Sequence, residues 1–453
     1  MNGAAKPTPD VAIIGMGRTG CSVARFLQVR HIPYIAFDEK MKELPDDLTG
    51  ELHRGMLSGD KLKAFKRLVV SPGIPWHHPA LEAARVAGVE LIGDLDFFHE
   101  YYHGELFAVT GTNGKSTVVH LLGQILEVLA GGVEIGGNIG TPMLDMLARP
   151  DHSPRAVLEL SSFQLERCQG IHPRWAALLN IQPDHADMHV DMAEYEAAKL
   201  RLFGKQGYGD IAVLPADEHW NDAAWNLGER GVHVRRFGTV AHSGEADAGL
   251  MGEPGARRIF WHAADKVHEI PSDQVRVRGE HQHINLAIVA QGAADAGVSP
   301  TVIVEALSAF PGLDHRLFYV GQVAGKAWYD DSKATNPDAA LAAMNSFDKV
   351  IWVCGGLTKG LSPMSMLPAV QQHVQLALVI GVDAKPFVAM LEESGVNYRV
   401  ATHLEEAVMQ AAHSSLDLPV LLSPAAASQD QFRDYAERGR HFCTAVAALE
   451  KKP

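Results

Sequence analysis

The chain has few cysteines and no long apolar run, and these absences exclude several classes of protein. Its four cysteines among 453 residues are scattered, without a CxxC pair. Scattered thiols do not make a disulfide framework and are typical of reduced, cytoplasmic proteins. The first ten residues, MNGAAKPTPD, lack the apolar segment of a signal peptide, and no apolar run reaches the roughly 20 residues of a membrane span. We therefore expect a cytoplasmic protein without membrane segments.

Positive charge is also scarce. The chain has 40 Lys and Arg against 54 Asp and Glu, which gives a formal net charge of −14. Nucleic acids and anionic membranes bind basic surfaces, so neither is an expected partner. Hydrophobic residues make up 47% and charged residues 21%, as in ordinary globular proteins. The length predicts about three domains, and we expect a monomer.

The most informative motif is TGTNGKST at residues 110–117. An apolar run, 107–109, precedes it and a helical apolar pattern follows it, which predicts a strand, a glycine-rich turn and a helix N-terminus. Such a turn binds phosphates through backbone N–H groups, with a lysine on the phosphate and a hydroxyl on Mg²⁺. Val109 stands where the full pattern has glycine, so this is a shortened variant. The expected ATP-binding residues are Gly111, Thr112, Asn113, Gly114, Lys115, Ser116 and Thr117.

A first α/β unit precedes this motif. A strand at 11–14 leads into GMGRTG at 15–20, and a second strand at 33–37 is followed by Asp38. Read alone, this pattern indicates a dinucleotide site for NAD, although the same turn can bind other diphosphates. The segment 68–73 predicts a third strand that ends in a loop at the ligand edge, with Ser71 and Gly73 in that loop.

Polar residues follow two apolar strands of the second unit. Glu159 ends one strand, and the pair Asp184 and His185 follows the other, at the sheet edge where ligands of parallel sheets bind. A carboxylate and an imidazole near ATP suit Mg²⁺, although ordinary loop polarity explains them too. Lys199 lies on an amphipathic helix and, by pattern alone, is a solvated lysine. Residues 204–275 predict strands with irregular connections.

A third unit follows residue 312. Its strands at 327–330, 350–354, 376–380 and 419–422 each end in small or polar residues, which predicts a further doubly wound sheet whose loops could close over the second unit. The expected fold class is α/β, with three consecutive domains: an N-terminal Rossmann-like domain, a central P-loop ATPase-like domain and a C-terminal Rossmann-like domain.

Together these motifs resemble the Mur ligases over nearly the whole chain. The resemblance is carried by GMGRTG (15–20), SPGI (71–74), TGTNGKST (110–117), GGNIG (136–140), ELSSFQLE (159–166), the DH pair (184–185), AAKLR (197–201), DHR (314–316), DSKATNP (331–337), GGLTKG (355–360) and LLSPAAASQDQF (421–432). It implies a UDP-substrate domain at 1–98, an ATP-binding domain at 99–312 and a glutamate-binding domain at 313–453.

The resemblance also implies a reaction and roles for residues. ATP would phosphorylate the carboxylate of UDP-N-acetylmuramoyl-L-alanine, and the amine of D-glutamate would attack the acyl phosphate, in peptidoglycan synthesis. Two Mg²⁺ ions are implied, with Ser116, Glu159, His185 and a carbamylated Lys199 as ligands. Lys115, Asn138, His185 and Lys199 would be catalytic, and Asn285, Arg316 and Asp331 would contact the nucleotide. The substrates would contact Thr19, Asp38, Ser71, Gly73, Asn138, Lys333, Thr335, Lys359, Ser423 and Phe432.

Some positions depart from the family pattern. They are Gln182 and Pro183 before the DH pair, Gln282 after His281, Asp314 before the HR pair, and the non-acidic Leu357 and Thr358 in GGLTKG. The last two lie in the amino-acid loop, so a relative that adds L-glutamate is an alternative. An NAD-dependent oxidoreductase is a more distant one, and it leaves TGTNGKST unexplained. A binding protein without catalysis is disfavoured by the joint presence of Lys115, Glu159, His185 and Lys199.

Overall fold

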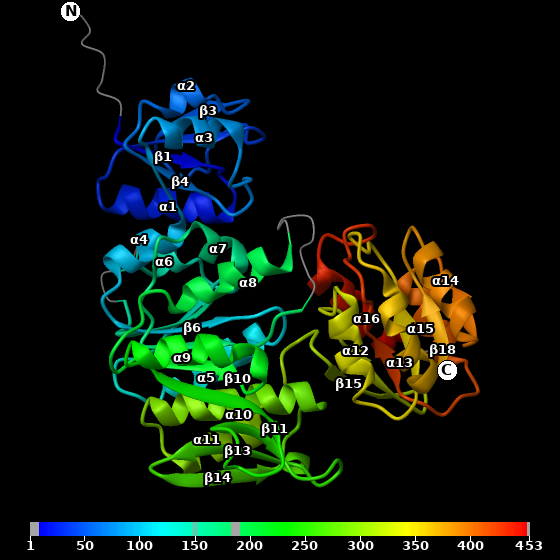
Figure 1. Ribbon diagram of the computed structural model, residues 1–453. Coiled ribbons are helices and arrows are strands. Elements are labelled where there is room, and N and C mark those ends of the chain that lie inside the picture. Colours follow the sequence, from blue (N-terminus) through cyan, green and yellow to red (C-terminus); the bar gives the residue numbers. More distant parts are fainter. Residues whose placement is uncertain (1–8, 148, 150–151, 183–190, 451–453) are drawn as a thin grey trace, which may run out of the picture.

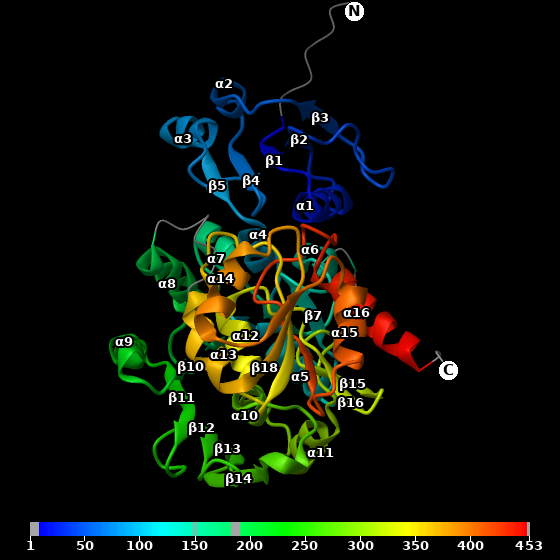
Figure 2. The ribbon, with the colours of Figure 1, turned by 90° about the vertical axis from the view of Figure 1, so that its right-hand side faces the viewer.

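Three parallel-rich sheets, one after another along the chain, make up the architecture. The computed structural model describes residues 9–147, 149, 152–182 and 191–450 (Figure 1). The N-terminal unit lies at one end of the central unit, and the C-terminal unit lies against the flank of the central one (Figures 1 and 2). No helix among the described residues combines the length and apolarity needed to cross a membrane.

The N-terminal unit is a five-stranded parallel sheet in the order β3-β2-β1-β4-β5. Strand β1 is buried at all four positions, as expected for an apolar run covered on both faces of a parallel sheet. The GMGRTG turn joins β1 to α1, as the sequence predicts. The elements are β1 (Val11–Ile14), α1 (Arg18–Val29), β2 (Tyr34–Asp38), β3 (Glu51–Arg54), α2 (Gly59–Leu62), β4 (Arg67–Val70), α3 (Pro79–Val86) and β5 (Glu90–Ile92).

Helix α4 (Asp94–Tyr101) connects this unit to the central one and begins with a buried carboxylate. Burial raises the pKa of Asp94 to about 6, against the hydrogen bond from Gln164 and the charge of Arg167, which lower it. The native chain therefore keeps this proton at pH values where the unfolded chain has lost it. The contribution of Asp94 to stability falls as the pH rises from about 4 to about 6 and is constant above that.

The free energy of unfolding of Asp94→Asn is therefore expected to increase relative to that of the wild type as the pH rises from 4 to 7, by up to about 3 kcal/mol. The measurement is the apparent melting temperature of both proteins across that pH range. Asp46→Asn, at an exposed position, is the control and should show no such trend. A difference between Asp94→Asn and wild type that is the same at pH 4 and pH 7 would contradict the argument.

The central unit is a nine-stranded sheet in the order β14-β13-β12-β11-β10-β9-β6-β8-β7. Its strands pair in parallel except for β12–β13 and β13–β14, which form an antiparallel extension. The sequence predicts strands with irregular connections for residues 204–275, but this segment also contains a helix, α9 (Asn221–Glu229). The elements are β6 (Glu105–Thr110), α5 (Lys115–Leu126), β7 (Glu134–Gly137), α6 (Met143–Leu147), β8 (Arg155–Glu159), α7 (Ser162–Arg167), β9 (Trp175–Leu178), α8 (Met192–Leu200), β10 (Ile211–Pro215), α9 (Asn221–Glu229), β11 (His233–Val240), β12 (Ala248–Met251), β13 (Arg258–Ala263), β14 (Lys266–Pro271), α10 (Glu280–Asp295) and α11 (Pro300–Ala309).

The C-terminal unit is a six-stranded sheet in the order β15-β16-β20-β17-β18-β19. Only the β15–β16 pair is antiparallel among its described pairings. The elements are β15 (Phe318–Val323), β16 (Lys326–Asp330), α12 (Pro337–Met344), β17 (Val350–Cys354), α13 (Leu367–His373), β18 (Val374–Val379), α14 (Lys385–Ser394), β19 (Tyr398–Val400), α15 (Leu404–Ala412), β20 (Val420–Leu422) and α16 (Tyr435–Leu449).

The apolar core joins the first two units and leaves the third separate. One continuous buried cluster contains Ile13 and Phe26 of the N-terminal unit together with Leu106 and Leu158 of the central one. The clusters of the C-terminal unit contain only its own residues. No apolar cluster of described residues therefore crosses the boundary between the central and C-terminal units. The candidate site lies at this boundary.

Candidate active site

A cavity of about 550 Å³ lies between the central and C-terminal units. It receives loops from the carboxyl ends of strands in both sheets, the edge at which parallel sheets bind ligands. Many of the predicted site residues line it, namely Gly111, Thr112, Asn113, Gly114, Lys115, Asn138, Glu159, Lys199, Asn285, Arg316, Asp331, Lys333, Thr335 and Lys359. The structure thus brings together residues that are up to 248 positions apart, from Gly111 to Lys359.

The phosphate loop has the predicted strand–turn–helix form. Strand β6 ends at Thr110 and helix α5 begins at Lys115. Gly114 caps the helix with a φ of +88°, and a Cβ there would lie 2.6 Å from Oδ1 of Asn285 on α10. Glycine is therefore required both by the backbone conformation and by the packing. The N-terminus of α5, with the positive end of the helix dipole, lies at the cavity, where Gly114 and Lys115 line it.

Lys115 lies folded along this loop. Its Nζ donates hydrogen bonds to the carbonyl oxygens of Gly111 and Thr112, both at 2.8 Å. The ammonium group is thus held within the turn that would surround a phosphate chain. Thr117, the last residue of the motif, is buried in the first turn of α5 and supports the loop from within the helix.

Glu159 is a buried anion at the base of the cavity. Its carboxylate accepts hydrogen bonds from Ser116 Oγ at 2.5 Å and from Asn138 Nδ2 at 2.9 Å. Burial alone would raise its pKa, but Lys115 and these two donors lower it below the usual value. Glu159 is therefore ionised at neutral pH. An ionised carboxylate beside a serine hydroxyl offers the hard oxygen ligands that Mg²⁺ prefers.

Lys199 is not the solvated lysine that its helical pattern indicates. It is 1% exposed, its Nζ donates to the Gly111 carbonyl oxygen at 2.9 Å, and it lies 4.4 Å from the centroid of the Tyr195 ring. Helix α8 thus brings a lysine to the phosphate loop. The predicted metal ligand His185, with its neighbours Pro183 and Asp184, lies outside the described residues.

Arg316 links the C-terminal unit to the phosphate loop. Its Nη2 donates to Ser116 Oγ at 2.6 Å, so that Arg316, Ser116 and Glu159 form a continuous chain of hydrogen bonds. Asp331 lies beside it and accepts from Ser423 Oγ at 2.7 Å. Burial raises the pKa of Asp331 to about 7, against the hydrogen bond from Ser423.

The C-terminal wall of the cavity contains two polar residues that the sequence analysis missed. Ser428 is 1% exposed, and its Oγ has no hydrogen-bond partner among the described residues. Tyr435 lies with its ring centroid 3.8 Å from Nζ of Lys333. Both line the cavity. Ser428 falls within the LLSPAAASQDQF motif, but no local pattern distinguishes it from Ser423.

Two predicted substrate residues are not in the lining as far as the structure describes it. Ser423 is fully buried and its hydroxyl is used by Asp331. Phe432 is partly buried and packs against an apolar cluster of the C-terminal unit, with its ring centroid 5.4 Å from that of His441. Ser423 therefore orients a lining residue, and Phe432 contacts the edge of the apolar cluster that includes Phe442 and Val446 of α16.

Four predicted residues lie in the N-terminal unit, away from this cavity. Asp38 accepts from the backbone N–H groups of Met16, Lys40 and Met41, and these donors lower its pKa although burial opposes them. Ser71 Oγ donates to the Gly15 carbonyl oxygen at 2.6 Å. Both side chains therefore tie together the loops at the ligand edge of this sheet. Thr19 lies in the first turn of α1 and Gly73 follows β4 at the same edge.

Two of the positions that depart from the family pattern, Gln182 and Gln282, line the cavity. Gln182 Oε1 accepts from Asn113 Nδ2 at 2.8 Å, so this glutamine supports the phosphate loop directly. Gln282 Oε1 lies 3.5 Å from Nδ2 of Asn285. Leu357 exchanges two backbone hydrogen bonds with Ala427, next to Ser428.

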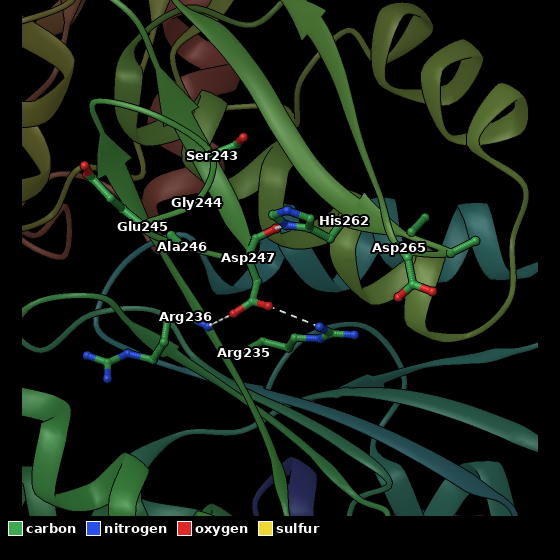
Figure 3. Close-up of a pocket in the computed structure, with 11 residues that line it drawn as sticks. Arg235, Arg236, Ser243, Gly244, Glu245, Ala246, Asp247, His262 and Asp265 are labelled. Carbon is green, nitrogen blue, oxygen red and sulfur yellow. Dashed lines mark hydrogen bonds and ion pairs between the residues drawn. The ribbon is translucent and has the colours of Figure 1, made fainter.

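Two other features of the described residues lie outside this cavity. A cavity of about 460 Å³ lies at the outer strands β11–β13, where Arg235 is paired with Asp247, and none of the predicted site residues that the structure describes lines it (Figure 3). His77, Glu166 and Glu194 also converge between the first two units. The side chain of His77 is largely exposed there, and Nη1 of Arg167 lies 3.7 Å from Oε2 of Glu166. A cation beside Glu166 already offsets its charge, so we assign no site to this cluster.

Comparison with known proteins identifies the three units. Residues 9–93 match the model of the Mur ligase MurD-like N-terminal domain, 109–293 the Mur ligase middle domain and 315–425 the Mur ligase glutamate ligase domain. The UDP-N-acetylmuramoylalanine–D-glutamate ligase of Methylococcus capsulatus is 36% identical over 97% of this chain and 95% of its own. The enzyme of the same name from Pseudomonas aeruginosa is 35% identical over 96% and 97%.

Solved structures agree on the fold. MurF from Acinetobacter baumannii superimposes with a TM-score of 0.60 at 17% identity, over 97% of this chain and 93% of that one. MurF ligase from Thermotoga maritima, in complex with ADP, gives 0.59 at 16% identity, over 98% and 96%. These findings confirm the α/β architecture and the resemblance inferred from the motifs. The chain belongs to the Mur ligase family.

Proposed function

We propose that this protein is an ATP-dependent ligase that joins D-glutamate to UDP-N-acetylmuramoyl-L-alanine in peptidoglycan synthesis. One observation carries the proposal: the phosphate loop and Glu159 line the same cavity as Lys333 and Lys359. An anionic nucleotide and an acidic amino acid can meet there. The two relatives compared above bear the name of this activity.

The reaction has two steps, phosphoryl transfer and amide formation. A carboxylate oxygen of the UDP substrate attacks the γ-phosphorus of ATP, and ADP leaves with the electrons of the broken P–O bond. The glutamate amine then attacks the acyl carbon, the C–O bond to phosphate breaks, and the amine loses a proton. Negative charge accumulates on phosphoryl oxygens throughout, so fixed cations are the main source of stabilisation. Lys115 and Arg316 are placed to supply them, Asn138 and His185 are assigned to the reacting carboxylate, and Asn285 and Asp331 to the adenosine.

The residues at the base of the cavity fit divalent metal ions. Ser116 and the ionised Glu159 would hold Mg²⁺, together with His185 and a carbamylated Lys199. When bound, Mg²⁺ neutralises charge on the transferring phosphoryl group. Carbamylation converts the Lys199 ammonium, which would repel a cation, into an anionic oxygen ligand. The burial of Lys199 beside the phosphate loop supports this assignment.

The acceptor pocket is assigned to the C-terminal wall. Lys333, Thr335 and Lys359 provide cationic and hydroxyl donors for the two carboxylates of glutamate. We add Ser428, because it lines the cavity and its buried hydroxyl has no hydrogen-bond partner in the part of the chain that the structure describes. Ser423 supports the pocket through its hydrogen bond to Asp331, and Phe432 packs beside the same loop.

The proposal also assigns the remaining parts of the chain. Residues 1–98 form the UDP-substrate domain, with Thr19, Asp38, Ser71 and Gly73 near the uridine diphosphate. Residues 99–312 bind ATP and 313–453 bind glutamate, and the three sheets fall within these ranges. We expect a monomer that works in the cytoplasm. An NAD-dependent activity of the GMGRTG loop is not favoured, because this loop lies within the match to the MurD-like N-terminal domain.

We expect D-glutamate to be the preferred acceptor, with a kcat/KM at least about tenfold above that for L-glutamate. A misplaced carboxylate or amine would leave buried charges unpaired in a pocket of fixed donors. The measurement is phosphate release with UDP-N-acetylmuramoyl-L-alanine, ATP and Mg²⁺, with each enantiomer in turn.

Reactions without UDP substrate and without glutamate are the blanks for this assay. A preference for L-glutamate would overturn the stereochemical assignment and leave the ligase assignment standing. Absence of phosphate release with either enantiomer, with ATP shown to bind, would overturn the ligase assignment.

A further inference from the structure

The link between the central and C-terminal units places one arginine across the cavity. Arg316 lies in the segment between α11, which ends at Ala309, and β15, which begins at Phe318. Its Nη2 donates a hydrogen bond to Ser116 Oγ at 2.6 Å, on the first turn of α5. Ser116 in turn donates to Glu159. The position of this guanidinium therefore connects the C-terminal unit to the phosphate loop.

Both neighbours of Arg316 have an unusual backbone conformation. His315 has a φ of +64° and Leu317 a φ of +51°, in the left-handed region that residues with a Cβ rarely adopt. Specific contacts hold them there. The His315 carbonyl oxygen accepts from the Lys333 N–H at 3.0 Å, and the Leu317 N–H donates to Asp331 Oδ1 at 3.0 Å.

The imidazole of His315 is held by a fully buried carboxylate. Its Nδ1 lies 2.6 Å from Oδ2 of Asp330, the last residue of β16. The other oxygen, Oδ1, accepts from the Ser332 N–H at 2.9 Å, so the carboxylate cannot rotate without losing a bond. Asp330 has 0% exposure, and this hydrogen bond is therefore shielded from water.

Helix α16 closes the other side of this arrangement with a glycine. A Cβ at Gly439 would lie 2.1 Å from His315 Nδ1 and 2.8 Å from Asp330 Oδ2. No larger residue fits against the ring in this position. On the same helix, Cys443 Sγ lies 3.5 Å from Asp330 Oδ2, a longer contact to the same carboxylate.

We propose that Asp330 is a positioning residue for nucleotide binding: with Gly439 it fixes His315, and His315 fixes Arg316 in its reach to the phosphate loop. The inference rests on the proposed use of ATP. Without the Asp330 carboxylate, the ring of His315 is free to turn, and the left-handed backbone on the N-terminal side of Arg316 loses one of the contacts that hold it. The guanidinium then samples many rotamers, and the entropy of ordering it must be met when the nucleotide binds.

The test measures the affinity for ATP with Mg²⁺ by calorimetry, and kcat and KM for ATP, in Asp330→Ala and Asp330→Asn. We expect Asp330→Ala to weaken ATP binding or kcat/KM by about tenfold or more. Asp330→Asn should stay within about threefold of wild type, because its amide can accept from Ser332 and donate to His315 Nδ1. The affinity for UDP-N-acetylmuramoyl-L-alanine should not change in either variant.

Two further variants separate positioning from general packing. Cys443→Ala removes a contact to the same carboxylate without touching His315, and it should behave like wild type. His315→Ala is measured as the second single variant, and the double variant Asp330→Ala/His315→Ala should bind ATP no more weakly than the worse of the two single variants, because both act through one contact.

Several outcomes would overturn the proposal. One is an ATP affinity of Asp330→Asn as low as that of Asp330→Ala, and another is an equal loss of ATP affinity in Cys443→Ala. Additive losses of ATP affinity in the double variant, or a parallel loss of affinity for the UDP substrate, would also overturn it. A wild-type chain that binds ATP but forms no amide would refute the proposed function, and ATP affinities would still decide the role of Asp330.

Discussion

Lys115→Ala is expected to lower kcat by roughly 10²- to 10³-fold or more, while binding of the UDP substrate is unchanged. The ammonium group lies in the phosphate loop, on the carbonyl oxygens of Gly111 and Thr112. Charge grows on the phosphoryl oxygens in the transition state, so removal of this cation acts on kcat more than on ground-state binding. Steady-state phosphate release and calorimetry with UDP-N-acetylmuramoyl-L-alanine measure the two quantities.

A matched control is Lys266→Ala, because Lys266 is an exposed lysine of the same unit. It should retain wild-type kcat and substrate affinity. Turnover by Lys115→Ala within a few fold of wild type would remove the central claim about the phosphate loop. An equal loss of UDP-substrate affinity would instead show that the substitution disturbs more than phosphoryl transfer.

Lys199→Ala is expected to be inactive and to be partly rescued by short-chain carboxylates such as formate, acetate or propionate. Carbamylation begins with attack of the neutral amine on the carbon of CO₂ and releases one proton, which leaves an anionic oxygen ligand. Lys199 is buried 2.9 Å from the Gly111 carbonyl oxygen, so truncation leaves a small space beside the phosphate loop that a carboxylate can enter. Activity is measured over a series of carboxylate concentrations and chain lengths.

A direct measurement complements the rescue. The enzyme is equilibrated with ¹³C-bicarbonate, and a carbamate carbon resonance is sought by NMR in wild type, Lys199→Ala and Lys266→Ala. The resonance should be present in the first and third proteins and absent in the second. Full activity of Lys199→Ala without added carboxylate, or a wild-type spectrum without a carbamate signal in an active sample, would contradict the assignment.

The sequence determined those features that depend on local pattern. The apolar strand, the glycine turn and the amphipathic helix of residues 107–126 specify a phosphate loop, because backbone dihedrals and helix capping act over a few residues. The order of strands and helices similarly specified three α/β units. The residues of this loop that line the cavity were all predicted, since each lies within one continuous motif.

Tertiary structure decided which distant residues meet. The contact between Ser116 and Arg316 joins positions 200 apart, and no periodicity encodes it. Ser423 and Ser428 lie in one motif, yet the hydroxyl of Ser423 is used by Asp331, whereas Ser428 lines the cavity. Local sequence does not distinguish them, because the direction of each side chain depends on how the loop after β20 packs.

Burial likewise changed the chemistry inferred from residue type. The helical pattern indicates that Lys199 is a solvated lysine. In the folded chain it is buried and contacts the Gly111 carbonyl oxygen of the phosphate loop. Asp330 ends a strand and reads as an ordinary polar terminus, and it is the close approach of α16 at Gly439 that makes it a buried partner of His315. Both outcomes depend on the desolvation and close packing that folding imposes on distant segments, which the sequence of each segment alone does not contain.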